Sequence, residues 1–104
     1  MPSSAPSRRA TLRAQIAVDV TLARGRVGCD VAGRTQDLGP GGMRVATRRP
    51  LRVDEHLAFA LTFEDGTRMT GRARVVREDV GNVYGLRFAR IAADDLERLE
   101  SLVS

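Results

Sequence analysis

The amino-acid sequence predicts an all-β fold, an antiparallel barrel or sandwich that carries one α-helix at its C-terminal end. Short segments that alternate apolar and polar residues recur along the chain between glycine- and proline-containing turns, which is typical of such folds. The last segment instead spaces its leucines three residues apart, which indicates a helix. With 104 residues, the chain can build one hydrophobic core but not two. We therefore expect a single domain over residues 8–104.

The first seven residues, MPSSAPS, are predicted to be a disordered arm in front of that domain. They combine two prolines and three serines with almost no apolar side chain to bury. A first strand is predicted over residues 14–22, because one face of it carries Ile16, Val18, Val20 and Leu22. Arg24 to Arg26 then form a turn, and residues 27–36 return as the antiparallel partner strand.

Four more strands follow by the same reasoning. A short strand at Met43 to Ala46 ends before Pro50, and residues 57–63 alternate again. The Asp-Gly pair inside residues 64–67 is a hairpin signal. Strands over residues 69–77 and 83–89 complete the set, with Gly81 and Asn82 between them.

The C-terminal segment, Ala93 to Val103, is predicted to be the helix. Asp94 or Asp95 can cap its N-terminus, and one face carries Leu96, Leu99, Leu102 and Val103. A helix of about eleven residues is marginal alone, so it must pack on the sheet.

The composition limits the classes of function. All 17 basic residues are arginines, and the formal net charge of +4 favours anionic partners. One cysteine, Cys29, and one histidine, His56, supply neither a disulfide, nor a zinc site, nor a nucleophile with its base. We therefore expect no enzyme, no metal and no cofactor. With no apolar run of transmembrane length and no secretory leader, a cytoplasmic protein without membrane contact is the default expectation.

Two segments carry chemistry: RRATLR at residues 8–13 and DLGPGG at residues 37–42. An arginine grips a phosphate or a guanine edge with two parallel hydrogen bonds, and it can stack on a base. The carboxylate of Asp37 can accept the N1–H and N2–H of guanine, which arginine cannot do. The glycines are expected to turn with positive φ and to offer N–H groups to an anion. Because the strand pair returns antiparallel, Arg9 and Asp37 are expected at the same end of the sheet, where they would recognise a guanine nucleotide without breaking a bond.

The arginine spacing is weak evidence by itself. Composition alone predicts roughly three Arg-x-x-x-Arg pairs, and the sequence contains several, which are Arg9/Arg13, Arg44/Arg48, Arg48/Arg52 and Arg68/Arg72. The ordinary interpretation of any one pair is a solvated charged surface. Only the order and the context of the motifs make them specific.

In that context the chain resembles the PilZ family over about residues 8–103. The resemblance is carried by the N-terminal arginines, the segment from Asp37 to Val45, GRARVVR at residues 71–77, YGLRF at residues 84–88 and the leucine-spaced helix. It implies a six-stranded antiparallel barrel with the helix packed on it. It also implies binding of the bacterial second messenger cyclic di-GMP through an RxxxR motif and a [D/N]xSxxG motif.

Residue by residue, the resemblance assigns Arg9 and Arg13 to the two motif arginines, which clamp phosphate and contact guanine. Asp37 would read a guanine edge, and Gly42 is the motif glycine. Gly39 departs from the pattern, because the family has serine there. A lost neutral hydrogen bond is worth about 0.5–1.5 kcal/mol, so binding would weaken by up to roughly tenfold.

Two further arginines are candidates through the same resemblance. Arg8, directly before the motif, is similar to members that accept two stacked messenger molecules, and an exposed arginine in the arm is its plain alternative. Arg77 aligns with a strand position that often lies near the ligand, although strand arginines commonly face solvent.

The leading hypothesis is thus a non-enzymatic cyclic di-GMP receptor. Its arginine segment, disordered when free, would order over the ligand and change a surface for an effector protein not identified by the sequence. A nucleotide-independent PilZ adaptor is the second hypothesis, and Gly39 favours it. A basic nucleic-acid-binding barrel is the third, supported by Arg44, Arg48, Arg49 and Arg52. It lacks an interleaved aromatic platform, so nucleic acid is the less favoured partner.

Overall fold

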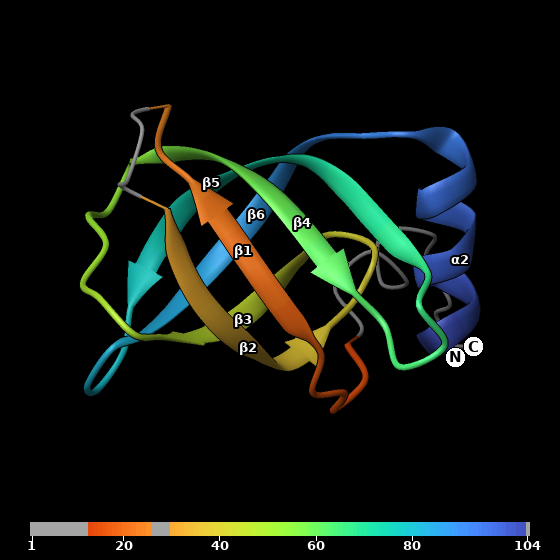
Figure 1. Ribbon diagram of the computed structural model, residues 1–104, viewed down its shortest axis with the longest axis horizontal. Coiled ribbons are helices and arrows are strands. Elements are labelled where there is room, and N and C mark those ends of the chain that lie inside the picture. The colour runs from red at the N-terminus through yellow and green to blue at the C-terminus, as the bar shows by residue number, and fades with distance from the viewer. Residues whose placement is uncertain (1–12, 26–29, 104) are drawn as a thin grey trace, which may run out of the picture.

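The computed structural model describes residues 13–25 and 30–103, which form a closed six-stranded antiparallel barrel with one helix at its end (Figure 1). The elements are β1 (Asp19–Ala23), β2 (Val31–Leu38), β3 (Gly42–Thr47), β4 (His56–Thr62), β5 (Arg68–Glu78), β6 (Val83–Ile91) and α2 (Ala93–Val103). The strands neighbour one another in the order β1-β2-β3-β6-β5-β4, and β4 closes the barrel on β1. The predicted barrel of six strands with a C-terminal helix is confirmed. The predicted arm at residues 1–7 lies outside the described residues.

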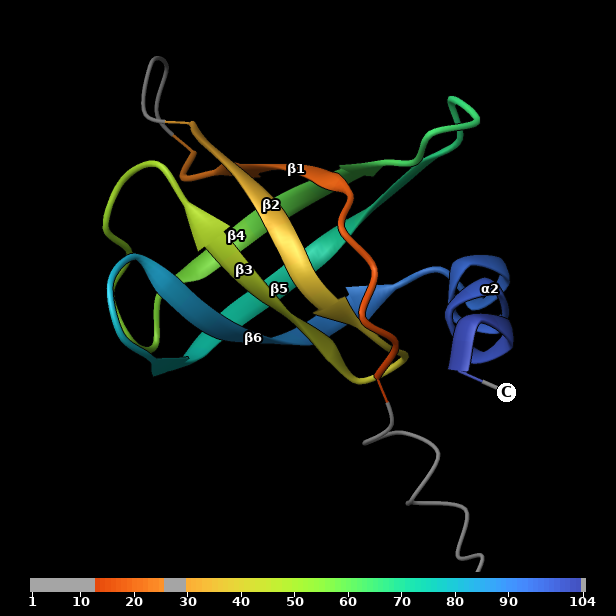
Figure 2. The ribbon, with the colours of Figure 1, turned by 90° about the horizontal axis from the view of Figure 1, so that it is seen from below.

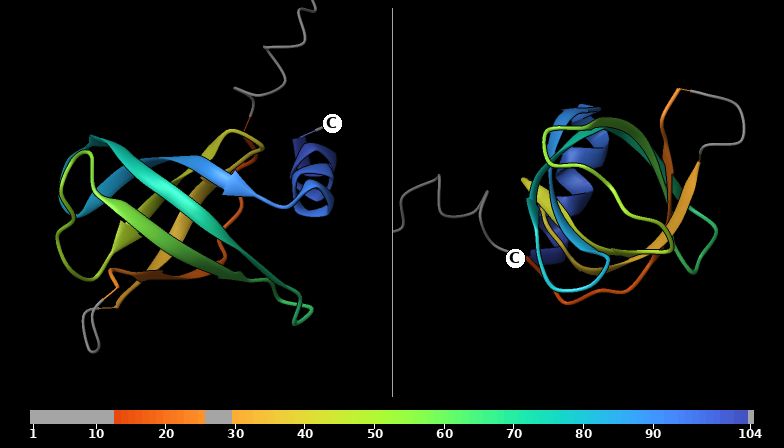
Figure 3. Two further views of the ribbon diagram at one scale, coloured as in Figure 1. Left: turned by 90° about the horizontal axis from the view of Figure 1, so that it is seen from above. Right: turned by 90° about the vertical axis from the view of Figure 1, so that its left-hand side faces the viewer.

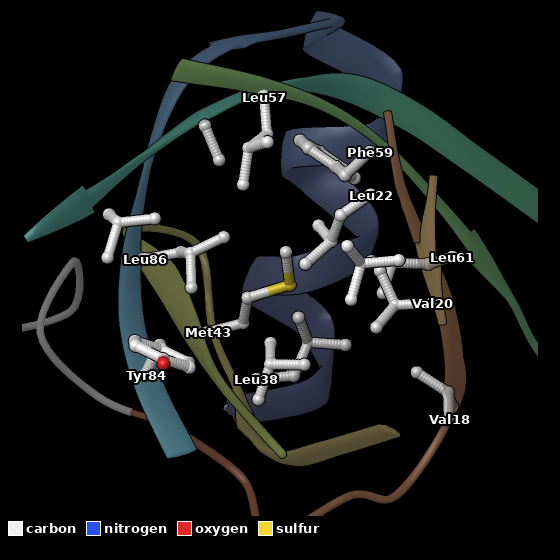
Figure 4. Packing of buried hydrophobic residues seen from close by; sticks show 14 of the residues in the cluster. Val18, Val20, Leu22, Leu38, Met43, Leu57, Phe59, Leu61, Tyr84 and Leu86 are labelled. Carbon is white, nitrogen blue, oxygen red and sulfur yellow. The ribbon is translucent and has the colours of Figure 1, made fainter. Parts of the chain in front are cut away.

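The barrel is filled by the alternating apolar residues of its strands (Figure 4). Val20 and Leu22 of β1 face Phe59 and Leu61 of β4, which pair with them across the closing seam. Tyr84 of β6 is fully buried, as expected of a core residue. The strict period of two therefore determines the inside of this barrel, as strand geometry requires.

Strand β1 begins at Asp19, five residues later than the sequence predicts. The segment from Ala14 to Val18 runs along β2 (Figure 2), but the buried hydroxyl of Thr35 interrupts its backbone pairing. Thr35 Oγ1 accepts a hydrogen bond from Val18 N at 2.9 Å and donates one to Ile16 O at 2.6 Å. The Thr35 side chain thus replaces the backbone hydrogen bonds of a regular strand pair, and it holds the segment against the barrel.

Helix α2 lies across one end of the barrel (Figure 3). Its Leu99 is fully buried in the core, whereas Leu102 is 39% exposed, so the predicted apolar face is only partly used. Leu96 N donates to Ala92 O at 2.9 Å, which puts the N-cap at Ala92. Asp94 and Asp95 therefore lie inside the first turn and stabilise the helix dipole, and the prediction that one of them is the cap is wrong.

Candidate functional site

Arg13 and Asp37, which lie far apart in the sequence, form an ion pair at the outer surface of the barrel. Arg13 Nη1 donates to Asp37 Oδ1 at 3.1 Å, and the two side chains are 32% and 23% exposed. Two backbone hydrogen bonds between Ala14 and Leu38, of 2.8 and 2.9 Å, hold Arg13 within reach of Asp37. The expected meeting of the arginine segment with Asp37 thus occurs at Arg13, whereas Arg8 and Arg9 lie outside the described residues.

Asp37 belongs to strand β2, and its predicted place in the glycine turn is wrong. It pairs with Arg44 of β3, and Leu38 after it pairs with Met43. Leu38 is fully buried, so the requirement to fill the core extends the strand two residues beyond its predicted end at Gln36. The turn is consequently shorter, and Asp37 is held on a rigid strand.

The glycines of this segment do not have the backbone that the sequence predicted. The glycines with positive φ in the described residues are Gly25, Gly66 and Gly81, so the expectation for Gly39, Gly41 and Gly42 is wrong. Gly39 is buried, and its N–H donates to Gly42 O at 3.0 Å, so it is not free to bind an anion. The expected anion-binding nest therefore lacks this donor.

The packing of two strands explains why position 42 is a glycine. It lies at the start of β3, opposite Arg87 of β6. A Cβ atom at this position would overlap the carbonyl oxygen of Leu86 and come within 3.1 Å of the Arg87 Cα. Glycine is thus required here by the close approach of two strands, whatever its relation to a ligand.

Arg77 lies in the same cross-strand row as Asp37. The row runs from Asp37 to Arg44, then to Gly85 and to Arg77, across β2, β3, β6 and β5. At the strand spacing of a sheet it spans roughly 15 Å. A Cβ at Gly85 would lie 3.3 Å from Arg77 Nη2, so the Arg77 guanidinium lies beside this glycine. Because Gly85 has no side chain, nothing projects from the sheet at this position of the row.

One carboxylate joins the two arginines of this row. Arg44 Nε and Arg77 Nε lie 3.1 Å from Asp79 Oδ2 and Oδ1, respectively. The Arg44 Nε is buried, and its N–H is not aligned for a hydrogen bond, so this contact is an ion pair of charge alone. Asp79 contacts two guanidinium groups from a position that the sequence analysis did not single out.

A cleft of about 770 Å³ opens beside this row, between the barrel and the start of α2. Four arginines line it: Arg13, Arg77, Arg87 and Arg90. The wall is completed by the β2–β3 turn, the end of β6 and the helix, through Pro40, Gly41, Phe88, Ala89, Ile91 and Leu96. Of the residues predicted for the site, Arg13 and Arg77 line the cleft, and Asp37 lies at its rim through its pair with Arg13.

Sequence reasoning missed Arg87 and Arg90 as site residues. Arg87 stands in the strand segment YGLRF, between the buried Leu86 and the half-buried Phe88, so alternation alone places it outside the barrel. Its neighbour across the sheet, Gly42, could not be known without the register of β3 and β6. The outward position was therefore readable from the sequence, but the cleft was not.

The residue types at this cleft are suited to binding an anion. Four arginines line one cleft, and a carboxylate lies at its rim, which suits a ligand that carries two negative charges and hydrogen-bond donors. Among residues 13–25 and 30–103, no group of three or more His, Cys, Asp or Glu could hold a metal ion. No helix in that part of the chain is long and apolar enough to cross a membrane.

Comparison with known proteins agrees with this architecture. The family model for the PilZ domain matches residues 7–104. The motility inhibitor MotI/DgrA of Bacillus subtilis is similar, with a TM-score of 0.72 and 20% identity over 86% of this chain, which spans 46% of that protein. The PilZ domain of CeSA from a cellulose-synthesizing bacterium has a TM-score of 0.66 and 19% identity, covering 88% of this chain and 93% of that domain. No curated protein sequence matches.

Proposed function

Because the chain belongs to the PilZ domain family, whose members are cyclic di-GMP receptors and adaptors, we propose that it is a non-enzymatic receptor for cyclic di-GMP. The observation that carries the proposal is the ion pair between Arg13 and Asp37 at the rim of a cleft lined by four arginines. These are the residue types that a cyclic dinucleotide needs. Guanidinium groups bind its two phosphates, and a carboxylate accepts from a guanine edge.

Binding exchanges ion pairs within the site. Arg13 leaves Asp37 for a phosphate or a guanine edge, and Asp37 then accepts the N1–H and N2–H of guanine. Arg77 likewise exchanges Asp79 for the ligand. Both pairs are partly exposed, so each is weak by itself and costs little to break. The ligand offers two charges to several arginines at once, which offsets these losses.

The arginine segment at residues 8–13 would close over the bound ligand. In this proposal Arg9 clamps the phosphates together with Arg13, and Arg8 contacts a second messenger molecule if one stacks on the first. Ordering the segment creates a new surface beside the cleft, where an effector protein would recognise the loaded state. The proposal places the receptor in the cytoplasm, and it involves no cofactor.

A nucleotide-independent adaptor is the alternative that one observation favours. Gly39 stands where the motif has serine, and its N–H is already used inside the turn. The position therefore contributes no hydroxyl to a ligand. If the barrel works by protein contact alone, the ion pair between Arg13 and Asp37 is a structural clip and not a preformed site.

Isothermal titration calorimetry with cyclic di-GMP tests the proposal. We expect saturable binding by the wild type, and a loss of roughly tenfold to a hundredfold in affinity for Arg9→Ala, Arg13→Ala and Asp37→Ala, as charged hydrogen bonds are worth about 1.5–3 kcal/mol. Arg49→Ala is the matched control, because Arg49 is exposed in a loop outside the cleft. Cyclic di-AMP is the ligand control, since adenine lacks the N1–H and N2–H donors.

Two results would contradict this proposal, the first the receptor itself and the second its binding site. The first is the absence of saturable heat at high micromolar cyclic di-GMP with a folded wild-type protein, which would leave the adaptor. The second is equal affinity for the wild type, Arg13→Ala and Asp37→Ala, which would place any nucleotide elsewhere.

A further inference from the structure

Strands β5 and β6 place four arginines in two facing pairs. The register sets Arg72 opposite Arg90 and Arg74 opposite Arg87. Residues directly opposite in a sheet have neighbouring side chains, and like charges there are destabilising. Two such pairs in succession destabilise the fold. The packing of the barrel does not require arginines at these outward positions.

The surroundings neutralise only part of this charge. Arg74 Nη1 contacts Asp54 Oδ1 at 2.8 Å, but that carboxylate side chain is 75% exposed. In the part of the chain that the structure describes, Arg72, Arg87 and Arg90 have no ion pair.

The flanking strands add no carboxylate either. On β4, His56 pairs with Arg74 and Ala58 pairs with Arg72. On β3, Gly42 pairs with Arg87. The four arginines therefore form a patch of net positive charge on the outside of the barrel, in which Arg74 alone has an ion pair in the described residues. We call this patch the arginine face: Arg72, Arg74, Arg87 and Arg90.

We propose that the arginine face docks an acidic helix of a partner protein. The arginines of each pair are about 5 Å apart across the strands, and the two pairs are about 7 Å apart along β5. On β6 a bulge places Arg87 and Arg90 three residues apart. Carboxylates three and four residues apart on a helix are separated by about 5–6 Å, so one helical row can meet both pairs. Guanidinium groups suit this partner because they bind carboxylates with two parallel hydrogen bonds.

The same face is poorly suited to single-stranded nucleic acid. Such ligands need exposed aromatic side chains on which bases stack. Phe88, the aromatic residue of β6 nearest to these arginines in sequence, is half-buried and also lines the cleft, but its ring packs against the core, 5.0 Å from that of Phe59. The arginine face thus attracts ligands by its charge, and carboxylates can bind it without stacking on an aromatic ring.

The arginine face and the cleft share two residues, because Arg87 and Arg90 also line the cleft. If the cleft binds cyclic di-GMP, which is the proposed function on which this step rests, the nucleotide and the acidic helix compete for both guanidinium groups. Nucleotide binding then releases the acidic helix without any movement of the barrel. The acidic helix therefore belongs to a partner of the nucleotide-free protein, and the effector of the proposed function binds the loaded state instead. Arg72 is not among the residues that line the cleft, so it belongs to the docking face alone.

Fluorescence anisotropy with a labelled helical peptide tests docking without nucleotide. The probe is an alanine-based peptide of about 18 residues with glutamates on one face, since shorter helices are marginal in water. At about 0.15 M salt, we expect Arg72→Gln to weaken peptide binding by roughly twofold to fivefold, and Arg72→Glu to weaken it further. Both variants should raise the unfolding temperature, because repulsion of Arg90 is removed, and both should keep the wild-type affinity for cyclic di-GMP.

The controls separate this proposal from general attraction to a basic protein. Arg49→Gln removes the same charge from the loop between β3 and β4, outside the arginine face, and should leave peptide binding unchanged. The proposal is overturned if Arg49→Gln weakens binding as much as Arg72→Gln does, or if a peptide with the same residues in scrambled order binds equally well. Tighter binding of duplex DNA or of phosphatidylglycerol vesicles would overturn it too. Peptide binding that persists in a protein without nucleotide affinity would support docking and contradict only the receptor.

Discussion

Gly42→Ala should unfold the barrel more readily, although it adds a single methyl group to the motif glycine. The new Cβ would overlap the Leu86 carbonyl oxygen, and it would lie 3.1 Å from the Arg87 Cα and 3.2 Å from the Leu86 carbonyl carbon. All three atoms are backbone atoms of β6. That strand is held by β5 on its other side and by the fully buried Leu86, so it cannot easily move away.

The cost follows from what β3 must give up to move instead. Separating β3 from β6 lengthens the adjoining hydrogen bond from Phe88 N to Gly41 O, now 3.0 Å, and weakens the ladder beside it. Each buried backbone group left without a partner costs about 1–3 kcal/mol. We expect a loss of about 2–4 kcal/mol in the free energy of unfolding, a large share of the roughly 5–15 kcal/mol typical of a domain.

Urea denaturation followed by circular dichroism measures this loss, and Gly85→Ala is the matched control. A Cβ at position 85 would approach only the flexible side chain of Arg77, with its nearest atom at 3.3 Å. We expect this control to stay within about 0.5 kcal/mol of the wild type. A Gly42→Ala protein that is as stable as the control would refute the steric argument. If the argument holds, lost nucleotide binding in Gly42→Ala reports unfolding and not a missing ligand contact.

Four other changes have defined outcomes. A double-mutant cycle of Arg13→Ala and Asp37→Ala should give a coupling of only about 0.2–1 kcal/mol in unfolding free energy, because the pair is partly exposed; a larger value would make the pair a major structural clip. Thr35→Val should lower the free energy of unfolding by about 2–4 kcal/mol, since the Thr35 hydroxyl bridges two backbone groups of the segment before β1. It should also lower the affinity for cyclic di-GMP, because Arg13 is then held less firmly. A variant as stable as the wild type would contradict the role of this hydroxyl. Tyr84→Phe should raise the melting temperature, because the buried hydroxyl has no hydrogen-bond partner in the described residues; a fall would reveal a partner for it. Gly39→Ser should strengthen cyclic di-GMP binding by up to roughly tenfold in calorimetry; unchanged affinity would show that no ligand atom reaches this hydroxyl.

Comparison of the predicted with the observed strands shows which features of the fold the local sequence pattern predicts. Alternation found the apolar face of β1 correctly, and Val18, Val20 and Leu22 are all buried. It did not find where the regular ladder begins, because that depends on the hydroxyl of Thr35, a residue of another strand. In the same way Asp37 was recognised as a site candidate but placed in a turn, since only the core position of Leu38 extends β2 past it.

The sequence by itself determined which side chains fill the barrel and which chemistry its surface offers, because the period of two and the residue types are both local properties. It also supplied the family, through the order of its motifs. Tertiary structure alone decided which of the 17 arginines converge. The strand order places β6 between β3 and β5, so that Gly85 joins Arg44 to Arg77 in one row, and Arg87 comes to lie opposite Arg74. Cross-strand register joins residues far apart in the chain, and no local pattern records it.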